Sequence, residues 1–151
     1  MQAPAHPPAH ALALRVYIED TDAGGIVYYV NYLKYLERAR TELMRSLGIA
    51  RAALPAAGCQ FVVHSMQVEY LRPAVLDDEL LAEARIESAG RARIDFAQRI
   101  LRSGEELCRA RVRVACIDTG TRRPRALPPA LRLPLAAPGA AANPTRMENP
   151  P

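Results

Sequence analysis

The sequence predicts an α+β fold in which an antiparallel β-sheet wraps around one long helix. Residues 29–47 carry apolar side chains at helical spacing, whereas the stretches between residues 61 and 117 alternate apolar and polar residues with period two. Short turns that contain glycine separate the later stretches, as is typical of antiparallel neighbours. Only two of the 13 prolines fall within residues 13–122, so long continuous elements can form there.

The proline distribution also sets the expected domain boundaries. A chain of 151 residues suits one domain, which we expect at residues 13–133. Residues 1–12 are expected to form a disordered N-terminal extension, and residues 134–151 a disordered tail rich in proline and alanine. The N-terminal stretch has neither the basic start nor the apolar run of a secretory signal. No segment approaches the roughly 20 apolar residues that would span a bilayer.

Cysteine and histidine usage favours a cytoplasmic protein without a metal site. The three cysteines, Cys59, Cys108 and Cys116, form no CxxC pair, and their odd number prevents complete pairing within one chain. We expect them to be reduced, as is usual in the cytoplasm. His64 has no companion at ligand spacing, so no metal is expected.

The first elements are a short strand and the long helix. Leu14, Val16 and Ile18 alternate with polar neighbours and predict the strand. The helix is predicted over residues 29–47, and Gly48 follows as its stop. Its expected apolar stripe consists of Val30, Leu33, Leu36, Leu43 and Leu47.

Four more strands are predicted from period-two alternation. The expected inward sets are Val62, His64, Met66, Val68 and Tyr70, then Leu80, Ala82, Ala84 and Ile86, then Ile94, Phe96 and Ile100, and finally Cys108, Ala110, Val112, Val114 and Cys116. An antiparallel sheet with one apolar face needs a cover, and the helix is the long element available. This arrangement is the hot-dog fold. The expected outward set, which suggests a subunit contact, includes Leu81, Ala97, Leu101, Ala115 and Ile117.

The loop before the helix carries the chemistry. Asp20 and Asp22 stand two residues apart, and Gly24 and Gly25 follow them. A helix N-terminus offers unpaired N–H groups that can polarise a carbonyl, and a nearby carboxylate can attack that carbonyl or activate water. The two glycines leave room for a substrate to come close. The alternative is structural, because an aspartate there can simply cap the helix or form an Asx turn.

Several runs carry a resemblance that favours the catalytic interpretation. They are residues 15–28, which include Glu19-Asp20-Thr21-Asp22-Ala23-Gly24-Gly25, then residues 31–33, 37–42, 61–63, 68–74, 76–78 and 123–125. These runs resemble the 4-hydroxybenzoyl-CoA thioesterase family. The chain looks most like the acyl-CoA thioesterases encoded beside the bacterial Tol–Pal envelope system. The resemblance covers nearly all of the expected domain.

The resemblance implies an acyl-CoA thioester hydrolase that needs no metal or cofactor. Asp22 matches the catalytic carboxylate of the family, and the backbone N–H at or near Tyr29 would bind the thioester carbonyl. Whether Asp22 acts as nucleophile or as general base stays open, as does whether Tyr28 and Tyr32 line the acyl pocket or pack in the core. The family further implies a homo-oligomer, a dimer or tetramer, with active sites at the subunit interface.

Arginines are concentrated in the second half of the chain. Residues 13–84 have a net charge of −3, and residues 85–132 a net charge of +7. Nucleic acid and a phosphorylated cofactor are both possible anionic partners for such a surface. Given the resemblance, we expect CoA phosphates and no nucleic acid. The candidate groups are Arg91 with Arg93, on either side of a turn, and Arg123 with Arg125.

One departure and three alternatives remain. The Tol–Pal-associated branch usually has histidine where this chain has Tyr29, so the acyl preference is less fixed than the reaction. Glu37 is a second candidate acid, although a carboxylate on a helix surface is more often structural. A non-catalytic hot-dog module that binds acyl-CoA or a protein partner is the alternative function. A hot-dog hydratase would need an Asp/His pair, which His64, in mid-strand, does not suggest.

Overall fold

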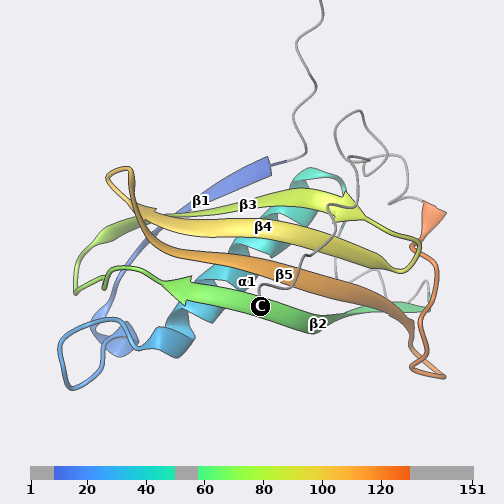
Figure 1. Ribbon diagram of the computed structural model, residues 1–151, viewed down its shortest axis with the longest axis horizontal. Coiled ribbons are helices and arrows are strands. Elements are labelled where there is room, and N and C mark those ends of the chain that lie inside the picture. Colours follow the sequence, from blue (N-terminus) through green and yellow to red (C-terminus); the bar gives the residue numbers. More distant parts are fainter. Residues whose placement is uncertain (1–8, 50–57, 130–151) are drawn as a thin grey trace, which may run out of the picture.

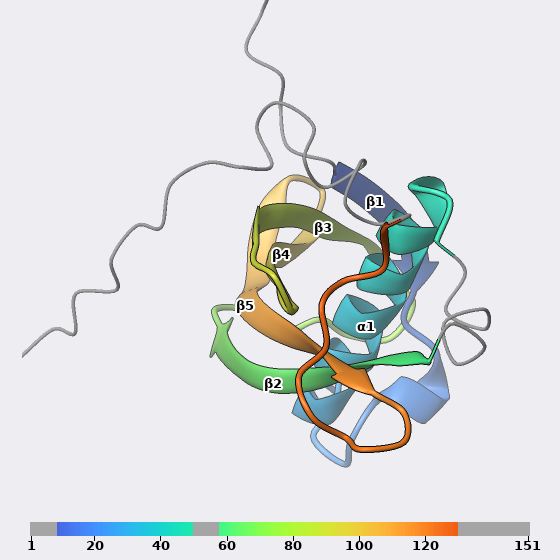
Figure 2. The ribbon, with the colours of Figure 1, turned by 90° about the vertical axis from the view of Figure 1, so that its right-hand side faces the viewer.

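The computed structural model describes residues 9–49 and 58–129 and confirms the hot-dog fold. Its elements are β1 (Ala9–Arg15), the 3₁₀ turn η1 (Ile18–Asp20), α1 (Tyr29–Ser46), β2 (Cys59–Tyr70), β3 (Glu79–Ala89), β4 (Arg93–Arg102) and β5 (Glu105–Asp118). The five strands form one antiparallel sheet in the order β1-β3-β4-β5-β2. The sheet curls around α1, which lies against its inner face (Figures 1 and 2). The tail predicted over residues 134–151 lies outside the described residues.

The first strand differs from its prediction at both ends. It begins at Ala9, so residues 9–12, expected in the disordered extension, pair with β3 instead. It ends at Arg15, and the chain then turns through η1. The Asp20 carboxylate caps this turn by accepting a hydrogen bond of 2.9 Å from the Tyr17 N–H. Ile18 therefore lies in the turn with 73% of its surface exposed, and its prediction as an inward strand residue was wrong.

The helix begins where predicted and ends at Ser46, and its buried face overlaps the predicted stripe at Leu36 and Leu43. It begins at Tyr29, and Gly48 follows it with a φ of +82°. Val30 and Leu33 are only partly buried, and the fully packed apolar positions are Tyr32, Tyr35, Leu36, Ala39, Leu43 and Met44. These positions recur at intervals of three and four, so they form one stripe against the sheet. The aromatic residues shift that stripe from the predicted one.

A buried polar contact ties α1 to the middle of the sheet. The Arg40 guanidinium donates a hydrogen bond of 2.9 Å to the Gln98 side-chain carbonyl. The Gln98 amide in turn donates one of 2.9 Å to the Leu36 carbonyl oxygen. Arg40 and Gln98 are both buried, and such groups stay in a core when they are hydrogen-bonded. The contact fixes the depth at which the helix sits on β4.

The four later strands, whose alternation and short turns predict a meander of consecutive neighbours, are not all in sequential order. β3, β4 and β5 are consecutive neighbours, as their short turns predict. β2 does not pair with β3. It pairs with β5 and forms the edge of the sheet opposite β1. Residues 71–78, which include Pro73, connect β2 to β3 across the sheet, and a connection of that length does not impose a hairpin.

Two register shifts change which side chains face inward. The pairing of β2 with β5 skips a residue between Val63 and Ser65, so His64 is the extra residue of a bulge. Phe61 is buried before the bulge, and Met66 and Val68 pack against the core after it, so Val62 and His64 do not share their face. A second shift, between Ile100 and Leu101 of β4, leaves Leu107 as an extra residue of β5, so the adjacent Leu107 and Cys108 are both buried. Leu101, which was predicted to face outward, is also buried.

Candidate active site

Backbone hydrogen bonds fold residues 20–28 into a tight loop in front of α1. The Asp22 N–H donates to the Ile26 carbonyl oxygen at 2.9 Å, and the Gly25 N–H donates to the Asp22 carbonyl oxygen at 3.0 Å. Gly25 has a φ of +79°, a conformation that favours glycine. The Tyr28 N–H and the Asn31 side-chain amide both donate to the Asp20 carbonyl oxygen, at 2.9 and 2.8 Å. The loop is thereby attached to the first turn of the helix.

The Asp22 carboxylate lies exposed at the tip of this loop. Its Oδ1 accepts a hydrogen bond of 2.8 Å from the Gly24 N–H, which is an Asx turn. No hydrogen bond to Oδ2 is found from any residue that the structure describes. No side chain caps α1, so capping by an aspartate does not occur there. One carboxylate oxygen is held in place, and the other faces solvent.

The start of α1 offers open backbone donors. The Tyr28 N–H is bonded to Asp20 and the Asn31 N–H to Tyr28, the latter at 2.8 Å. Within residues 9–49 and 58–129, no acceptor is found for the N–H groups of Tyr29 and Val30. A helix N-terminus also carries a partial positive charge of about 0.5. This end of the helix therefore can hold a polarised carbonyl oxygen or an anion.

Tyrosine rings gather around the same helix end. The Tyr29 ring centroid lies 5.1 Å from that of Tyr28 and 5.9 Å from that of Tyr70. The Tyr70 hydroxyl also donates to the Tyr29 carbonyl oxygen at 3.3 Å. All three rings are about half exposed. Tyr70 was not among the predicted site residues, and its one signal was an aromatic side chain at the end of a strand otherwise assigned to the core.

Tyr28 and Tyr32 have different surroundings. Tyr28 lies at the surface beside the loop, where it can contact a substrate. Tyr32 is buried, and its hydroxyl oxygen accepts a hydrogen bond of 2.9 Å from the Ala74 N–H. Burial raises the pKa of Tyr32 above its ordinary value. Tyr32 therefore packs in the core beneath the exposed rings.

The connection between β2 and β3, residues 71–78, supports the loop of Asp22. The Val27 N–H donates to the Ala74 carbonyl oxygen at 2.9 Å. Asp77, with a φ of 69°, and Asp78 lie in the turn just before β3. The Asp78 carboxylate accepts hydrogen bonds from the Val75 N–H at 2.9 Å and from Arg102 at 2.7 Å. Partial burial alone would raise the pKa of Asp78, but these hydrogen bonds outweigh it and lower that pKa. The Asp78 carboxylate thus holds the turn that supports the loop of Asp22.

Glu37 lies apart from this cluster in the chain. It is exposed on α1, eight residues after Tyr29. That spacing corresponds to about 12 Å along the helix axis. The carboxylate beside the open helix end is Asp22.

The predicted arginine groups meet, but at the other end of the molecule. The Leu127 N–H donates to the Arg91 carbonyl oxygen at 2.8 Å, which joins the β3–β4 turn to the segment after β5. Figure 1 shows both at the end of the sheet opposite the loop of Asp22. Arg91 and Arg123 are exposed, and neither has an ion pair with the described residues. Within the chain, the structure does not bring these arginines to Asp22.

The other two predicted arginines have internal partners. Arg93 forms an ion pair with Asp95. The Arg125 guanidinium donates to the Gly58 carbonyl oxygen at 2.8 Å and to the Asp118 carboxylate at 3.0 Å. Hydrogen bonds from the Thr121 and Gly120 N–H groups lower the pKa of Asp118, and Arg125 lowers it further by a smaller amount. These contacts hold the turns in which the arginines lie.

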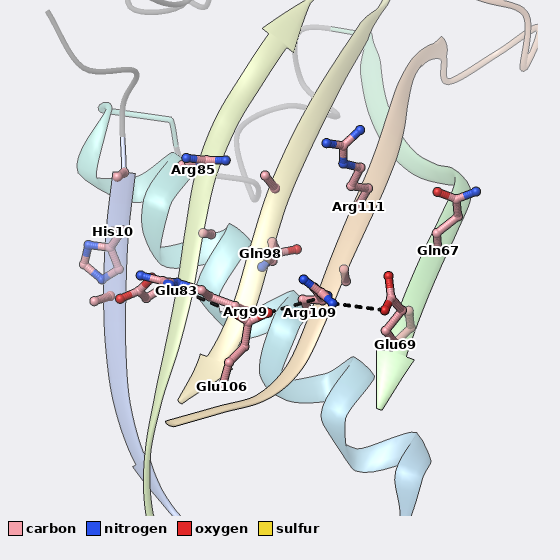
Figure 3. Close-up of a pocket in the computed structure, with 16 residues that line it drawn as sticks. His10, Gln67, Glu69, Glu83, Arg85, Gln98, Arg99, Glu106, Arg109 and Arg111 are labelled. Atoms are coloured by element: carbon pink, nitrogen blue, oxygen red, sulfur yellow. Dashed lines mark hydrogen bonds and ion pairs between the residues drawn. The ribbon is translucent and has the colours of Figure 1, made fainter. Parts of the chain in front are cut away.

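The outer face of the sheet contains an open hollow of about 1260 Å³ (Figure 3). Oppositely charged side chains cross it, with Arg99 2.6 Å from Glu83 and Arg109 3.4 Å from Glu69. Small residues such as Ala97 form its floor. None of the predicted site residues lines this hollow, and α1 lies on the other side of the sheet.

Two classes of feature are missing from the described part of the chain. Residues 9–49 and 58–129 contain no group of three or more His, Cys, Asp or Glu side chains that could hold a metal ion. The same residues include no helix with the length and hydrophobicity that crossing a membrane requires.

Comparison with known proteins gives related sequences over most of the chain. The acyl-CoA thioesterase YbgC of Haemophilus influenzae is 43% identical over 116 residues, which cover 76% of this chain and 85% of that protein. The acyl-CoA thioester hydrolase YbgC of an Escherichia coli strain is 46% identical over 116 residues, with 76% and 87% covered.

Solved structures agree with these relatives. A probable thioesterase from Bartonella henselae is 37% identical with a TM-score of 0.75, covering 80% of this chain and 99% of that one. A 1,4-dihydroxy-2-naphthoyl-CoA thioesterase from Synechocystis shares the fold, with a TM-score of 0.80 at 23% identity and with 85% and 96% of the two chains covered. The model of the thioesterase-like superfamily matches residues 16–135. The chain therefore belongs to the thioesterase-like superfamily.

Proposed function

We propose that this chain hydrolyses acyl-CoA thioesters to a free acid and CoA, with Asp22 as the catalytic carboxylate. The observation that carries the proposal is an exposed carboxylate, fixed through one oxygen, on the loop that leads into the open N-terminus of α1. The thioester carbonyl would accept a hydrogen bond from the Tyr29 N–H. That bond strengthens as the oxygen becomes negative during attack, so it lowers the barrier.

The acyl-CoA substrate class is supported by the relatives. Two proteins that are 43% and 46% identical to this chain are named as acyl-CoA thioesterases. We also propose the narrower family assignment, to the 4-hydroxybenzoyl-CoA thioesterase family near its Tol–Pal-associated members. A cytoplasmic location of the protein is likewise part of the proposal. No metal or cofactor is needed, because the carboxylate and the helix end supply both attack and charge stabilisation.

Exposed tyrosine rings would form the wall of the acyl site. Tyr28, Tyr29 and Tyr70 present half-exposed rings next to the loop, while Gly24 and Gly25 leave the opposite side open. Aromatic rings bind both planar and aliphatic acyl groups through their large apolar surface. Tyr29 contributes its backbone to the carbonyl and its ring to this wall.

The arginines can complete the site if two chains pair through β2. This strand forms one edge of the sheet. Its first residues lie beside Arg125, which bonds to Gly58, and its last residue, Tyr70, bonds to Tyr29. Antiparallel pairing of two copies about a two-fold axis brings the start of one β2 to the end of the other. Arg91 and Arg123 of one protomer would then approach the Asp22 loop of its partner and bind the CoA phosphates there.

A tetramer would require a second contact surface. The outer face, with its paired arginines and glutamates and its small residues, is too charged for a core and too apolar for an ordinary solvent surface. Interfaces between subunits tolerate such a mixture. We assign this face to the contact between two dimers.

Hydrolysis assays test the proposal directly. Purified protein is incubated with benzoyl-CoA and with straight-chain acyl-CoAs of increasing length, and released CoA thiol is measured. Turnover of at least one ester supports the proposal. Binding of acyl-CoA in calorimetry without any turnover would instead establish the non-catalytic module. A single turnover in oxygen-18 water tests the route, because label in the Asp22 carboxylate requires a mixed anhydride that water opens at the Asp22 carbonyl, whereas a general base acquires no label.

A further inference from the structure

Two cysteine side chains meet in the core where β2 and β5 pair. The Sγ atoms of Cys59 and Cys116 lie 2.6 Å apart, and both residues are fully buried. Cys59 is opposite Asp118 in the sheet and Cys116 is opposite Phe61, so the two cysteines are diagonal neighbours on adjacent strands. The third cysteine, Cys108, lies near the other end of β5, opposite Tyr70. None of these thiols has a role in the proposed hydrolysis.

We propose that Cys59 and Cys116 form a redox-active dithiol that a hydroperoxide converts into an intrachain disulfide. One thiol, as its thiolate, attacks a peroxide oxygen and becomes a sulfenic acid. The second sulfur then displaces the hydroxyl group of that sulfenic acid, which leaves as water. In sum, two thiols and one hydrogen peroxide give one disulfide and two waters, and the two sulfurs together lose two electrons.

The geometry selects this pair over any pair that includes Cys108. A disulfide bond is about 2.05 Å long, so Cys59 and Cys116 need little movement to form one. The separation already observed is well inside the van der Waals contact of two sulfur atoms. Cys108 pairs with residues at the far end of β2, and its sulfur would have to cross several residue pairs of the ladder to reach either partner.

The surroundings of the dithiol keep it reduced until the strand opens. Burial and the neighbouring Cys59 thiol raise the pKa of Cys116 to about 12, so its thiolate is scarce in the closed structure. Cys59 is the first residue of β2, which pairs on one side only. Fraying of this strand end admits water and a small oxidant. Oxidation is therefore expected to be slow in the folded protein and specific to these two residues.

A disulfide here would secure the arginine segment as well as the edge strand. The Cys116 carbonyl oxygen accepts a hydrogen bond of 2.9 Å from the Arg125 N–H. The Arg125 side chain reaches the Gly58 carbonyl oxygen, next to Cys59. The new bond closes a loop over residues 59–116, which restricts the unfolded chain. We expect it to raise the melting temperature by roughly 5–10 °C, reversibly on reduction.

Thiol counting and peptide mapping test the proposal on the folded wild-type protein. After exposure to hydrogen peroxide and quenching with catalase, the protein is unfolded and alkylated. The alkylated thiols should fall from three to one, and the digest should contain a crosslinked pair of peptides with Cys59 and Cys116. The Cys108→Ser variant should lose both of its thiols in the same way.

Matched variants decide between this pair and any other. Cys59→Ala and Cys116→Ala, checked for folding by circular dichroism, should each form no intrachain disulfide. A crosslink that includes Cys108, or a wild-type protein that keeps three alkylatable thiols after prolonged oxidation, would overturn the proposal. Because the readout is covalent, the result is independent of whether the chain hydrolyses acyl-CoA.

Discussion

The Gly24 backbone N–H donates a hydrogen bond of 2.8 Å to Oδ1 of Asp22. This contact orients the carboxylate and leaves its second oxygen toward solvent. The structural and the catalytic interpretations of Asp22 are therefore compatible, because the Asx turn occupies one oxygen and chemistry needs the other.

Replacing Asp22 by asparagine removes the charge and keeps the shape. The amide oxygen can still accept from Gly24, so the fold should persist. We expect kcat to fall by at least about 10²-fold, as when a general base or nucleophile is lost. Steady-state kinetics and circular dichroism measure the two effects. Glu19→Gln, on an exposed carboxylate just before the loop, is the matched control and should keep full activity. Wild-type turnover by D22N would show that Asp22 is not the catalytic carboxylate and would leave Asp20 and Glu37 as the candidates.

A methyl group at Gly24 should disturb the carboxylate without disturbing the fold. A Cβ built at Gly24 would lie 3.2 Å from Asp22 Oδ1, closer than comfortable contact. Since the side chain must move aside, we expect Gly24→Ala to lower kcat by roughly 10-fold, with KM less affected, as for a misplaced catalytic group. Gly120→Ala is the matched control, because its Cβ would meet the Asp118 carboxylate at 3.3 Å far from Asp22. Equal losses in both variants would contradict the assignment.

Substitution of Arg91 and Arg123 should weaken substrate binding with little change in the chemical step. For Arg91→Gln and Arg123→Gln we expect KM for acyl-CoA to rise several-fold at nearly constant kcat. The effect should shrink in high salt, because exposed charges are screened over about 8 Å at physiological ionic strength. Acyl-pantetheine esters, which lack the nucleotide phosphates, provide the control substrate. If the wild type had the same KM for both esters, these arginines would not bind the phosphates.

Mixed oligomers test whether two chains share one site. In a dimer of D22N with R123Q, a shared site combines the Asp22 of one chain with the Arg123 of the other. Mixing the two variants should therefore restore sites that combine a wild-type KM with a wild-type kcat, a combination that neither variant shows alone, since D22N lacks the kcat and R123Q the KM. A site within one chain cannot be restored in this way. Sedimentation checks the assembly, and a fully active species near the monomer mass of 16.6 kDa would exclude both the interface and the shared site.

Asp95 should stabilise the fold in a manner that depends on pH. Partial burial tends to raise its pKa, but hydrogen bonds from Arg113 at 2.8 Å and Ser88 at 2.9 Å, together with the Arg93 charge, lower it. A lowered folded pKa means stability that is present above the ordinary value near 3.9 and is lost as pH falls through the folded value. Asp95→Asn should cost about 1–3 kcal/mol of unfolding free energy at pH 7 and much less near pH 2. Urea unfolding at both pH values measures this, and an equal cost at both would contradict the charge-based explanation.

Local periodicity was sufficient to predict the helix and the β3–β4–β5 hairpins. The helix begins at Tyr29 as expected, because its apolar spacing and the glycines before it are local signals. The period-two segments around Ile94 and Val112 were assigned correctly for the same reason. The loop of Asp22 was identified from local sequence together with the family resemblance.

Features that depend on distant partners could not be predicted in this way. No local pattern in the β2 sequence indicates that this strand pairs with β5, or that His64 is an unpaired extra residue. The contact between Tyr70 and Tyr29 joins residues 41 positions apart, so no local pattern signals it. The start of β1 at Ala9, just after the proline cluster, depends on the pairing with Arg85 of β3.

The bulge at His64 shifts the alternation of side chains in β2 by one position. Side chains of a strand alternate between two faces, so one extra residue reverses every assignment that follows it. Phe61 and Val68 differ in the parity of their numbers, yet both pack against the same core because His64 lies between them. Loss of that one residue would leave both halves of the strand oriented as they are now, and Tyr70 would stay beside the helix. Loss of a residue in the middle of either half, away from the bulge, would turn part of the strand inside out.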